Sequence, residues 1–334
     1  MRKPLEEYTF AAAYIGSYVN KLMDKQALMR LAQAKDLAAI ESILVDFGYG
    51  EAKELYERDI EFFIRREQNR LIRMIFSTVP KKEEMGLFTL PMDYHNVKVC
   101  LKSEFLGITP DENNLVSSGG VSEQKIMAMV KERNYTHMSS YMREAIEESV
   151  DAFSRSRDPQ IIDLILDKAC YEEMYEMALN VDVDFIINLV KKQLDLLNLK
   201  SFVRLRQMGK SWNVFDKVYL EHGDVPKALY MSHWEESYSQ IAERLRPYNL
   251  KEVMEKGAAQ VVEQNDFSLL EKLCADAVME YNKTAKYESF GIAPIAAYWL
   301  AKEVEIDNLR IILLGKKVGL PAEDIIERLR EPYV

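Results

Sequence analysis

The stretch Glu305-Ile306-Asp307-Asn308-Leu309-Arg310 has two counterparts earlier in the chain, Asp93-Tyr94-His95-Asn96-Val97-Lys98 and Asp195-Leu196-Leu197-Asn198-Leu199-Lys200. Each one reads acid, two residues, asparagine, aliphatic residue and base, and the copies begin 102 and 110 residues apart. Acids and bases at helical spacing are common on exposed helices, so one copy alone would carry no information. A period near 100 residues is too long for a short-repeat solenoid, and three copies therefore predict a domain that is present three times.

An acidic residue also begins a predicted helix upstream of each copy. These residues are Asp36, Asp158 and Asp266, which precede the copies by 57, 37 and 39 residues. The first repeat thus has about 20 extra residues, which we place between residues 56 and 91. Turn-forming stretches near 109–120 and 222–226 then separate three predicted domains, 1–115, 116–228 and 229–334. We expect the acid and the asparagine of each copy to be structurally equivalent: Asp93, Asn96, Asp195, Asn198, Glu305 and Asn308.

The composition favours helices throughout. Glycine and proline together make up 23 of 334 residues, about 7% against a usual ~12%, while good helix formers are abundant. One apolar stripe at helical spacing contains Val183, Ile186, Val190, Leu194 and Leu197, and another contains Ile161, Leu164, Ile165, Lys168 and Ala169. No series of alternating strands is present. We therefore predict an all-α fold of three similar helical bundles.

Aromatic residues follow a helical spacing near the start of the chain, at Tyr8, Phe10, Tyr14 and Tyr18. The simplest interpretation is one face of the first helix, packed with Leu22 on its own bundle. The alternative is that this face contacts a partner.

Charge and cysteine content restrict the class of protein. The net charge of −10 makes nucleic acid an unfavourable partner, because an acidic chain repels phosphates. The three cysteines are far apart in sequence and suggest reduced thiols in a cytosolic protein. The longest uncharged stretches, 8–20 and 289–301, have 13 residues each, whereas a membrane-spanning helix needs about 20. We expect no direct membrane span and no signal peptide.

Motifs for catalysis are not found. No phosphate-binding loop occurs, and Gly48-Tyr49-Gly50 is interpreted as a helix-ending turn. The four histidines are dispersed, without the spacing of a metal site. No Gly-x-Ser-x-Gly elbow is present, although a triad assembled from distant residues is possible in any fold. We therefore assign no catalytic, cofactor-binding or metal-binding residue. A helical enzyme with a dispersed site and a free-standing helical scaffold remain alternatives.

Two segments are basic in an otherwise acidic chain. Residues 64–82 contain six bases and one acid, and residues 185–220 contain seven bases and two acids. They are ordinary exposed helix faces, or surfaces complementary in charge to a partner. RNA binding is a third alternative, although the aromatic residues among these bases are not regularly arranged. The candidate partner-contact residues are Arg65, Arg66, Arg70, Arg73, Lys200, Arg204, Arg206 and Lys210.

The C-terminal third carries a family resemblance. The run from Phe290 to Ile312, the following Gly315 to Pro321, and the ending Leu329 to Val334 resemble the C subunit of V/A-type rotary ATPases, whose eukaryotic counterpart is the d subunit. Tyr14, the stretches 28–39 and 47–50, and Asp158 to Asp163 also resemble that family. The resemblance covers essentially the whole chain.

The resemblance implies a non-catalytic adaptor that needs no cofactor. It implies three similar helical domains with pseudo-threefold symmetry, forming a funnel. The wide end would lie on the cytosolic face of the membrane proteolipid ring, and the cup would receive the central shaft of the D and F subunits. One copy would turn with the rotor, and the isolated chain would be a monomer. Whether protons or sodium ions are moved, and whether ATP is made or hydrolysed, stays open.

Overall fold

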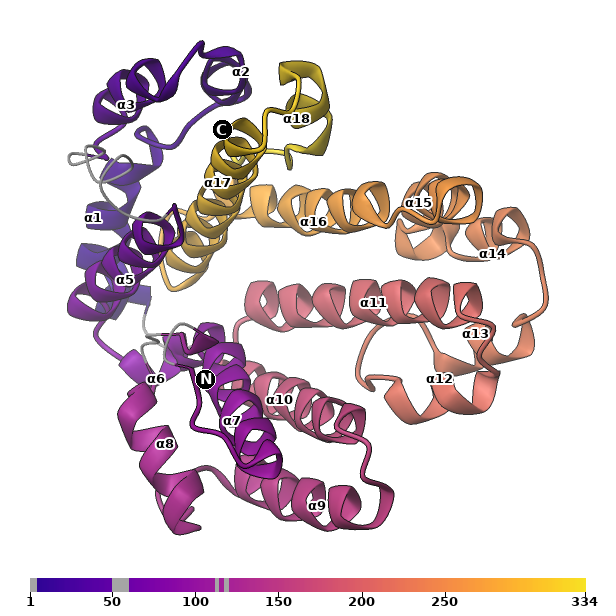
Figure 1. Cartoon of the computed structure of the whole chain (residues 1–334). Coiled ribbons are helices and arrows are strands. Elements are labelled where there is room, and N and C mark those ends of the chain that lie inside the picture. The colour runs from indigo at the N-terminus through magenta and orange to yellow at the C-terminus, as the bar shows by residue number, and fades with distance from the viewer. Residues whose placement is uncertain (1–4, 50–59, 112–113, 117–119) are drawn as a thin grey trace. The chain divides into compact units, whose positions relative to one another are not determined.

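The computed structural model describes residues 5–49, 60–111, 114–116 and 120–334. Within these residues the secondary structure is helical and contains no strand, which confirms the predicted all-α class. The chain divides into two compact units, residues 1–80 with 236–334, and residues 81–235. Figure 1 shows the helices that make up each unit.

The first unit combines the beginning and the end of the chain. Its helices are η1 (Leu5–Tyr8), α1 (Thr9–Val19), α2 (Lys25–Gln33), α3 (Leu37–Asp46), α5 (Ile60–Thr78), α14 (Tyr238–Arg244), η4 (Arg246–Tyr248), α15 (Lys251–Gln264), α16 (Ser268–Asn282), η5 (Lys283–Tyr287), α17 (Ala293–Lys317) and α18 (Ala322–Arg328). The long helix α17 contacts α1, α2, α5, α16 and α18. Leu28, Leu31 and Ile64 share one hydrophobic core with Ile306 and Leu309. The two ends of the chain therefore fold together.

The second unit is built around α10. Its helices are α6 (Lys82–Met85), η2 (Gly86–Phe88), α7 (Leu90–Leu106), α8 (Glu123–Glu132), α9 (Ser140–Ser156), α10 (Gln160–Val181), α11 (Asp184–Gln207), α12 (Trp212–Val218) and α13 (Lys227–Ser232). Helix α10 contacts α7, α9 and α11. Its buried face contains Ile162, Leu166 and Cys170, so the predicted stripe that begins at Ile161 does not face this core. The stripe predicted for α11 is correct at Ile186, Val190 and Leu194, which are buried.

Side-chain caps explain where several helices begin. Asp36 caps α3 by accepting the Ala39 amide at 2.9 Å. Asp158 and Asp266 each accept a backbone amide two residues later, at 2.9 Å, at the starts of α10 and α16. The three acids that the sequence predicted as helix starts therefore bind backbone amides at helix starts. Gly319, with φ of 74°, follows the end of α17, as its sequence predicted.

The three-domain division 1–115, 116–228 and 229–334 remains a prediction. Of the about 20 extra residues placed between 56 and 91, residues 56–59 lie outside the described residues. Residues 112–113 and 117–119 of the first predicted linker also lie outside the described residues. The same holds for Gly50 of the predicted turn. The preceding part of that turn does end α3, since Gly48 has φ of 82° and the Tyr49 amide donates to the Leu44 carbonyl. No helix in the described parts of the chain combines the length and apolar character needed to cross a membrane.

Candidate functional site

The three repeated asparagines make the same contact. Asn96 donates to the Val116 carbonyl and accepts the Val116 amide, both at 2.8 Å. Asn198 binds the carbonyl and amide of Leu220 at 2.8 and 2.9 Å. Asn308 binds those of Arg330 at 3.0 and 2.8 Å. All three side chains are buried within α7, α11 and α17. Each asparagine thus fixes the segment that follows its long helix, through both polar groups of one backbone residue.

Each repeated acid binds the backbone just before the start of a helix. Asp93 accepts the Val121 amide at 3.2 Å, ahead of α8. Asp195 accepts the amides of Asp224 and Val225 at 3.1 and 2.9 Å, ahead of α13. Glu305 accepts the Met23 amide at 2.5 Å, ahead of α2. The third acid therefore ties the C-terminal long helix to a segment 282 residues earlier in the chain.

Burial makes these acids depend on their donors. Asp195 is 3% exposed, and this burial raises the pKa of its carboxyl, while the backbone amides of Val225 and Asp224 lower it. The net shift is upward, so the ionised form is held at a desolvation cost that the two amides only partly offset. A substitution that moves these amides away from the Asp195 carboxylate should therefore lower the stability of the fold.

Glycines allow the backbone to approach two of the acids. A methyl group on Gly223 would overlap the Asp195 carboxylate, and one on Gly120 would overlap that of Asp93. In the third copy the donor follows Leu22 instead of a glycine, and the acid is glutamate, which reaches one methylene further. The close approach of backbone to carboxylate thus explains why Gly120 and Gly223 have no side chain. Where this glycine is replaced by Leu22, the acid is the longer Glu305.

We expect Gly223→Ala to destabilise the protein by about 1–3 kcal/mol, because the Asp195 carboxylate must move away from its amide donors. Chemical denaturation followed by circular dichroism measures the loss. Gly16→Ala is the control, because Gly16 lies within α1 and has no neighbour within 4 Å of an added methyl group. Alanine there should be neutral or stabilising by about 0.5–1 kcal/mol. Equal stability of the two variants would show that the close approach has no energetic role.

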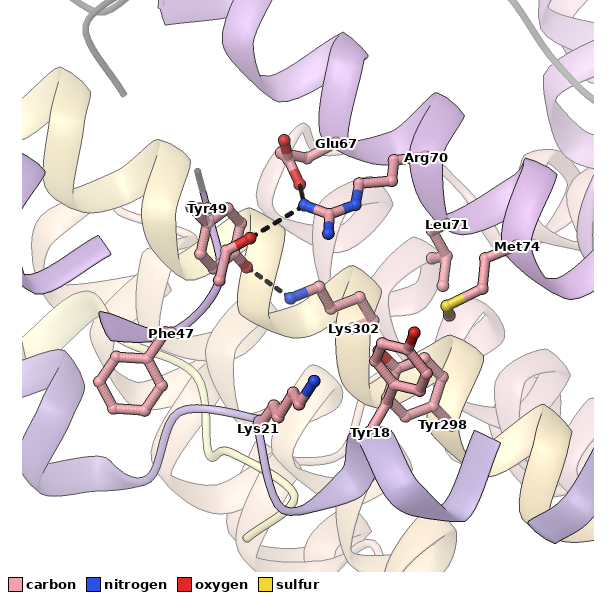
Figure 2. A pocket seen from close by; sticks show the side chains of 11 residues that line it. Tyr18, Lys21, Phe47, Tyr49, Glu67, Arg70, Leu71, Met74, Tyr298 and Lys302 are labelled. Atoms are coloured by element: carbon pink, nitrogen blue, oxygen red, sulfur yellow. Dashed lines mark hydrogen bonds and ion pairs between the residues drawn. The ribbon is translucent and has the colours of Figure 1, made fainter. Parts of the chain in front are cut away.

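Glu305 also belongs to a buried polar cluster with Tyr49 and Lys302. Figure 2 shows Tyr49 and Lys302 of this cluster. The Tyr49 hydroxyl donates to Glu305 Oε1 at 2.5 Å, and Lys302 Nζ donates to the Tyr49 oxygen at 2.8 Å and to Glu305 Oε1 at 2.5 Å. Lys302 Nζ also lies 4.2 Å from the centroid of the Tyr49 ring. Burial, followed by the charge of Glu305, raises the pKa of Tyr49 well above its usual value. Tyr49 therefore stays protonated and donates its hydrogen bond.

A small cavity of about 80 Å³ adjoins this cluster. Arg70 donates to the Gly48 carbonyl at 3.0 Å and lies 3.6 Å from Glu67, which is 3% exposed. Figure 2 shows the charged ends of Lys21, Arg70 and Lys302 around the same space. The lining of this cavity includes the cations Lys21, Arg70 and Lys302 and the carboxylate of Glu67. The arrangement fixes the end of α3 against α5 and α17.

Comparison with known proteins identifies the family. Residues 11–328 match the family model described as "ATP synthase (C/AC39) subunit". The chain belongs to this family. It is 23% identical to the C subunit of the V-type sodium ATPase of Enterococcus hirae, over 94% of this chain and 95% of that protein. It is 23% identical to the C subunit of the A-type ATP synthase of Methanobrevibacter smithii (96% and 88% covered) and 21% identical to that of Methanocaldococcus jannaschii (96% and 86% covered). The resemblance seen in the sequence is confirmed.

In this member of the C/AC39 family, the first basic segment is largely used within the molecule. Arg66 lies 3.3 Å from Glu67 and over the Phe63 ring, and Arg70 contacts Glu67 and Gly48. Arg65 is half-buried on α5, and Arg73 is exposed. Of these four arginines, only Arg70 lines the cavity beside Tyr49. Their role in partner contact remains a prediction.

The second basic segment lies at the end of α11 and beyond it. Lys200 is half-buried, and Arg206 is half-buried over the Phe202 ring at 5.3 Å from its centroid. Arg204 and Lys210 are exposed. Arg204 and Arg206 also lie in the last helical turn, where positive charge is favourable. Partner contact by this segment is likewise a prediction, and Arg204 and Lys210 are the two exposed residues among these four.

The predicted packing of the aromatic residues near the start of the chain was wrong for Phe10 and Tyr14. Helix α1 buries Ala11, Ala12 and Ile15, whereas Phe10 is 73% exposed and Tyr14 is 39% exposed. The small side chains let α1 pack closely on α17, which leaves the larger aromatic rings outside. The Phe10 and Tyr14 rings stack, with centroids 6.1 Å apart, and the half-buried Tyr18 ring is tilted by 56° against Tyr14. Tyr8 and Leu22 are buried, as predicted.

Sequence reasoning missed three participants in the polar cluster at Glu305. Lys302 precedes Glu305 by three residues, and this spacing could have indicated an ion pair on one helix face. The sequence places Tyr49 only in a turn. Met23 contributes a backbone amide, which leaves no mark in the sequence. In the described residues, no group of three histidine, cysteine, aspartate or glutamate side chains is placed to hold a metal ion.

Proposed function

We propose that the chain is the non-catalytic central-stalk rotor subunit of a V/A-type ATPase. It would act as a socket that couples the D and F shaft to the membrane proteolipid ring and transmits torque during ATP-coupled ion transport. The observation that carries this proposal is the family match over residues 11–328. The names of the relatives, C subunits of a sodium ATPase and of ATP synthases, support it. The protein would lie on the cytosolic face of the membrane, held there by its partners.

The contacts within the chain suit a part that transmits torque. Such a part must resist twisting, and close-packed helices have low compressibility. Buried asparagines lock the segments after α7, α11 and α17, and Glu305 joins the two ends of the chain. The equivalence of the three asparagine contacts supports three similar domains with pseudo-threefold symmetry, arranged as a funnel. This arrangement is part of the proposal.

Co-purification from membranes tests the proposal. An affinity tag on the chain is expected to recover the shaft subunits and the proteolipid ring from gently solubilised membranes, with one copy of the chain per complex. A helical enzyme or a free-standing scaffold would be recovered without the shaft and the ring. Recovery of the chain alone, under conditions in which the remaining ATPase stays assembled, would contradict the adaptor role.

We expect the double substitution Arg204→Glu/Lys210→Glu to reduce the co-purified shaft and ring by about fivefold or more, because it reverses two exposed charges of a basic surface. Arg206 is kept because it packs over Phe202. Quantitative gel analysis of the recovered complex measures the effect. Lys131→Glu/Arg157→Glu is the control, since it reverses two exposed charges elsewhere in the same unit. Equal recovery of both variants, with unchanged helical content, would remove this surface from the interface.

A further inference from the structure

The cavity of about 80 Å³ beside Tyr49 is lined by four separate segments of the chain. Lys21 follows α1, and Gly48 follows α3. Arg70 belongs to α5, and Lys302 belongs to α17. All the described residues that line the cavity belong to the unit of residues 1–80 and 236–334. A ligand held here would therefore contact segments of one unit that are far apart in the sequence.

The described lining of the cavity carries an excess of positive charge. Its charged residues are three cations and one carboxylate: Lys21, Arg70, Lys302 and Glu67. Two further charged residues contact this set, Arg66 at Glu67 and Glu305 at Lys302, and they cancel each other. These described residues therefore leave two positive charges in balance, in a chain whose net charge is −10. Such a local excess attracts an anion and repels a further cation.

Two of these cations are exposed and keep hydrogen-bond donors for a ligand. Lys21 is exposed, and the contact that it makes within the described residues is with the Tyr18 ring, whose centroid lies 4.7 Å from Nζ. The Arg70 side chain is 58% exposed and donates to the Gly48 carbonyl. Arg70 also lies 3.6 Å from Glu67, beyond ordinary hydrogen-bond distance. Because a guanidinium has five N–H groups, Arg70 can bind an anion and keep the Gly48 contact.

Helix α17 supplies two more donors, Lys302 and Tyr298 (Figure 2). Lys302 Nζ donates to Glu305 and to the Tyr49 oxygen, so one of its three N–H groups remains. Tyr298 is 4% exposed, and its hydroxyl forms no hydrogen bond with a described residue. Burial, followed by the charge of Glu305, raises the pKa of Tyr298, so the hydroxyl stays protonated. A hydroxyl buried in this way normally has a hydrogen-bond partner, and an oxygen atom in the cavity would supply it.

The size of the cavity and the placement of its donors favour a small oxyanion. A volume of about 80 Å³ exceeds what one water molecule needs but is far below the ~300–1,000 Å³ of sites for drug-sized ligands, so a nucleotide is too large. Figure 2 shows the charged ends of Lys21, Arg70 and Lys302 on different sides of one space. A tetrahedral anion has oxygens that point to all of these sides, whereas a planar carboxylate meets fewer of them.

We propose that this cavity binds one phosphate ion, through the three cations of its lining and the Tyr298 hydroxyl. Bound phosphate would hold the ends of α1 and α3 against α5 and α17, and would stabilise the unit in which the two ends of the chain meet. The inference does not rest on the proposed function, because the contacts lie within one unit of this chain.

Calorimetric titration of the full-length chain with inorganic phosphate, at an ionic strength held constant with sodium chloride, tests the site. We expect one phosphate per chain with a Kd of about 1 mM or tighter. Phosphate at about ten times the Kd should raise the unfolding temperature by about 2–5 °C. Lys21→Ala is expected to weaken phosphate binding by about tenfold, and Tyr298→Phe by about fivefold or more, because each removes a donor to the anion.

The matched controls are Lys25→Ala and Tyr287→Phe, which change exposed residues that do not line the cavity. Both should bind phosphate within about twofold of the wild type. Thermal melts without phosphate verify that all four variants fold, since neither Lys21 nor Tyr298 forms a hydrogen bond with a described residue.

Three outcomes would overturn the proposal and leave the proposed function untouched. The first is that the wild-type chain binds no phosphate at about 10 mM, ten times the expected Kd. The second is that Lys21→Ala and Tyr298→Phe bind phosphate as tightly as their controls do, which would place the anion elsewhere. The third is that acetate or ADP binds more tightly than phosphate and loses affinity in the same two variants, which would assign the cavity to a carboxylate or to a nucleotide.

Discussion

Replacement of Glu305 by alanine is expected to destabilise the unit that joins the two ends of the chain by about 3–5 kcal/mol. Glu305 is 4% exposed and accepts hydrogen bonds from the Met23 amide, the Tyr49 hydroxyl and Lys302. Alanine leaves a largely buried ammonium and a buried hydroxyl without their carboxylate, which costs more than the lost packing. Urea unfolding followed by circular dichroism measures the total loss.

Hydrogen exchange locates that loss. Glu305→Ala should speed exchange in α2 and the centre of α17, because the tie between them is gone, while α10 and α11 in the other unit keep their protection. Glu305→Gln retains an acceptor of the same size and should cost less than alanine. Glu327→Ala is the control, since Glu327 is exposed on α18. A Glu305→Ala protein as stable as this control would mean that the cluster does not hold the two ends together.

Local features of the fold could be predicted because they depend on neighbours in sequence. Asp36 caps α3 through an amide three residues away, and the α11 stripe identified Ile186 and Leu194 as buried. Periodicity does not show which apolar face meets the core. On α1 the small face packs and the aromatic face is outside, because close packing on α17 needs small side chains. On α10 the predicted stripe is half-buried beside the core face, and it lines a groove next to α9.

The repeated acids and asparagines could be identified from the sequence, but their partners could not. Asn96, Asn198 and Asn308 each bind a backbone amide and carbonyl, and backbone groups are the same at every residue except proline. The contact of Glu305 with Met23 spans 282 residues and joins opposite ends of the chain. Only a fold that brings these ends together reveals the pairing, which is why the polar cluster around Glu305 was missed.

Replacement of Asn198 by alanine is expected to cost about 2–4 kcal/mol, because one buried side chain satisfies both the amide and the carbonyl of Leu220. Asn198 is 1% exposed, and Leu220 is also buried, so water does not readily replace the lost amide group. Urea unfolding measures the loss. Hydrogen exchange should quicken at Leu220 and in α12, while the unit that contains α17 is unchanged.

Asn188→Ala provides the control for this effect, since Asn188 is exposed on the same helix and should change stability by less than about 0.5 kcal/mol. Asn198→Asp separates the two hydrogen bonds, because a carboxylate still accepts the Leu220 amide but cannot donate to the Leu220 carbonyl. It should be at least as destabilising as alanine, since it buries a charge that faces a carbonyl oxygen. If Asn198→Ala were no less stable than Asn188→Ala, the repeated asparagine would be a shared sequence feature without a structural role. The chain would then depend on helix packing alone for the rigidity that the proposed role in torque transmission requires.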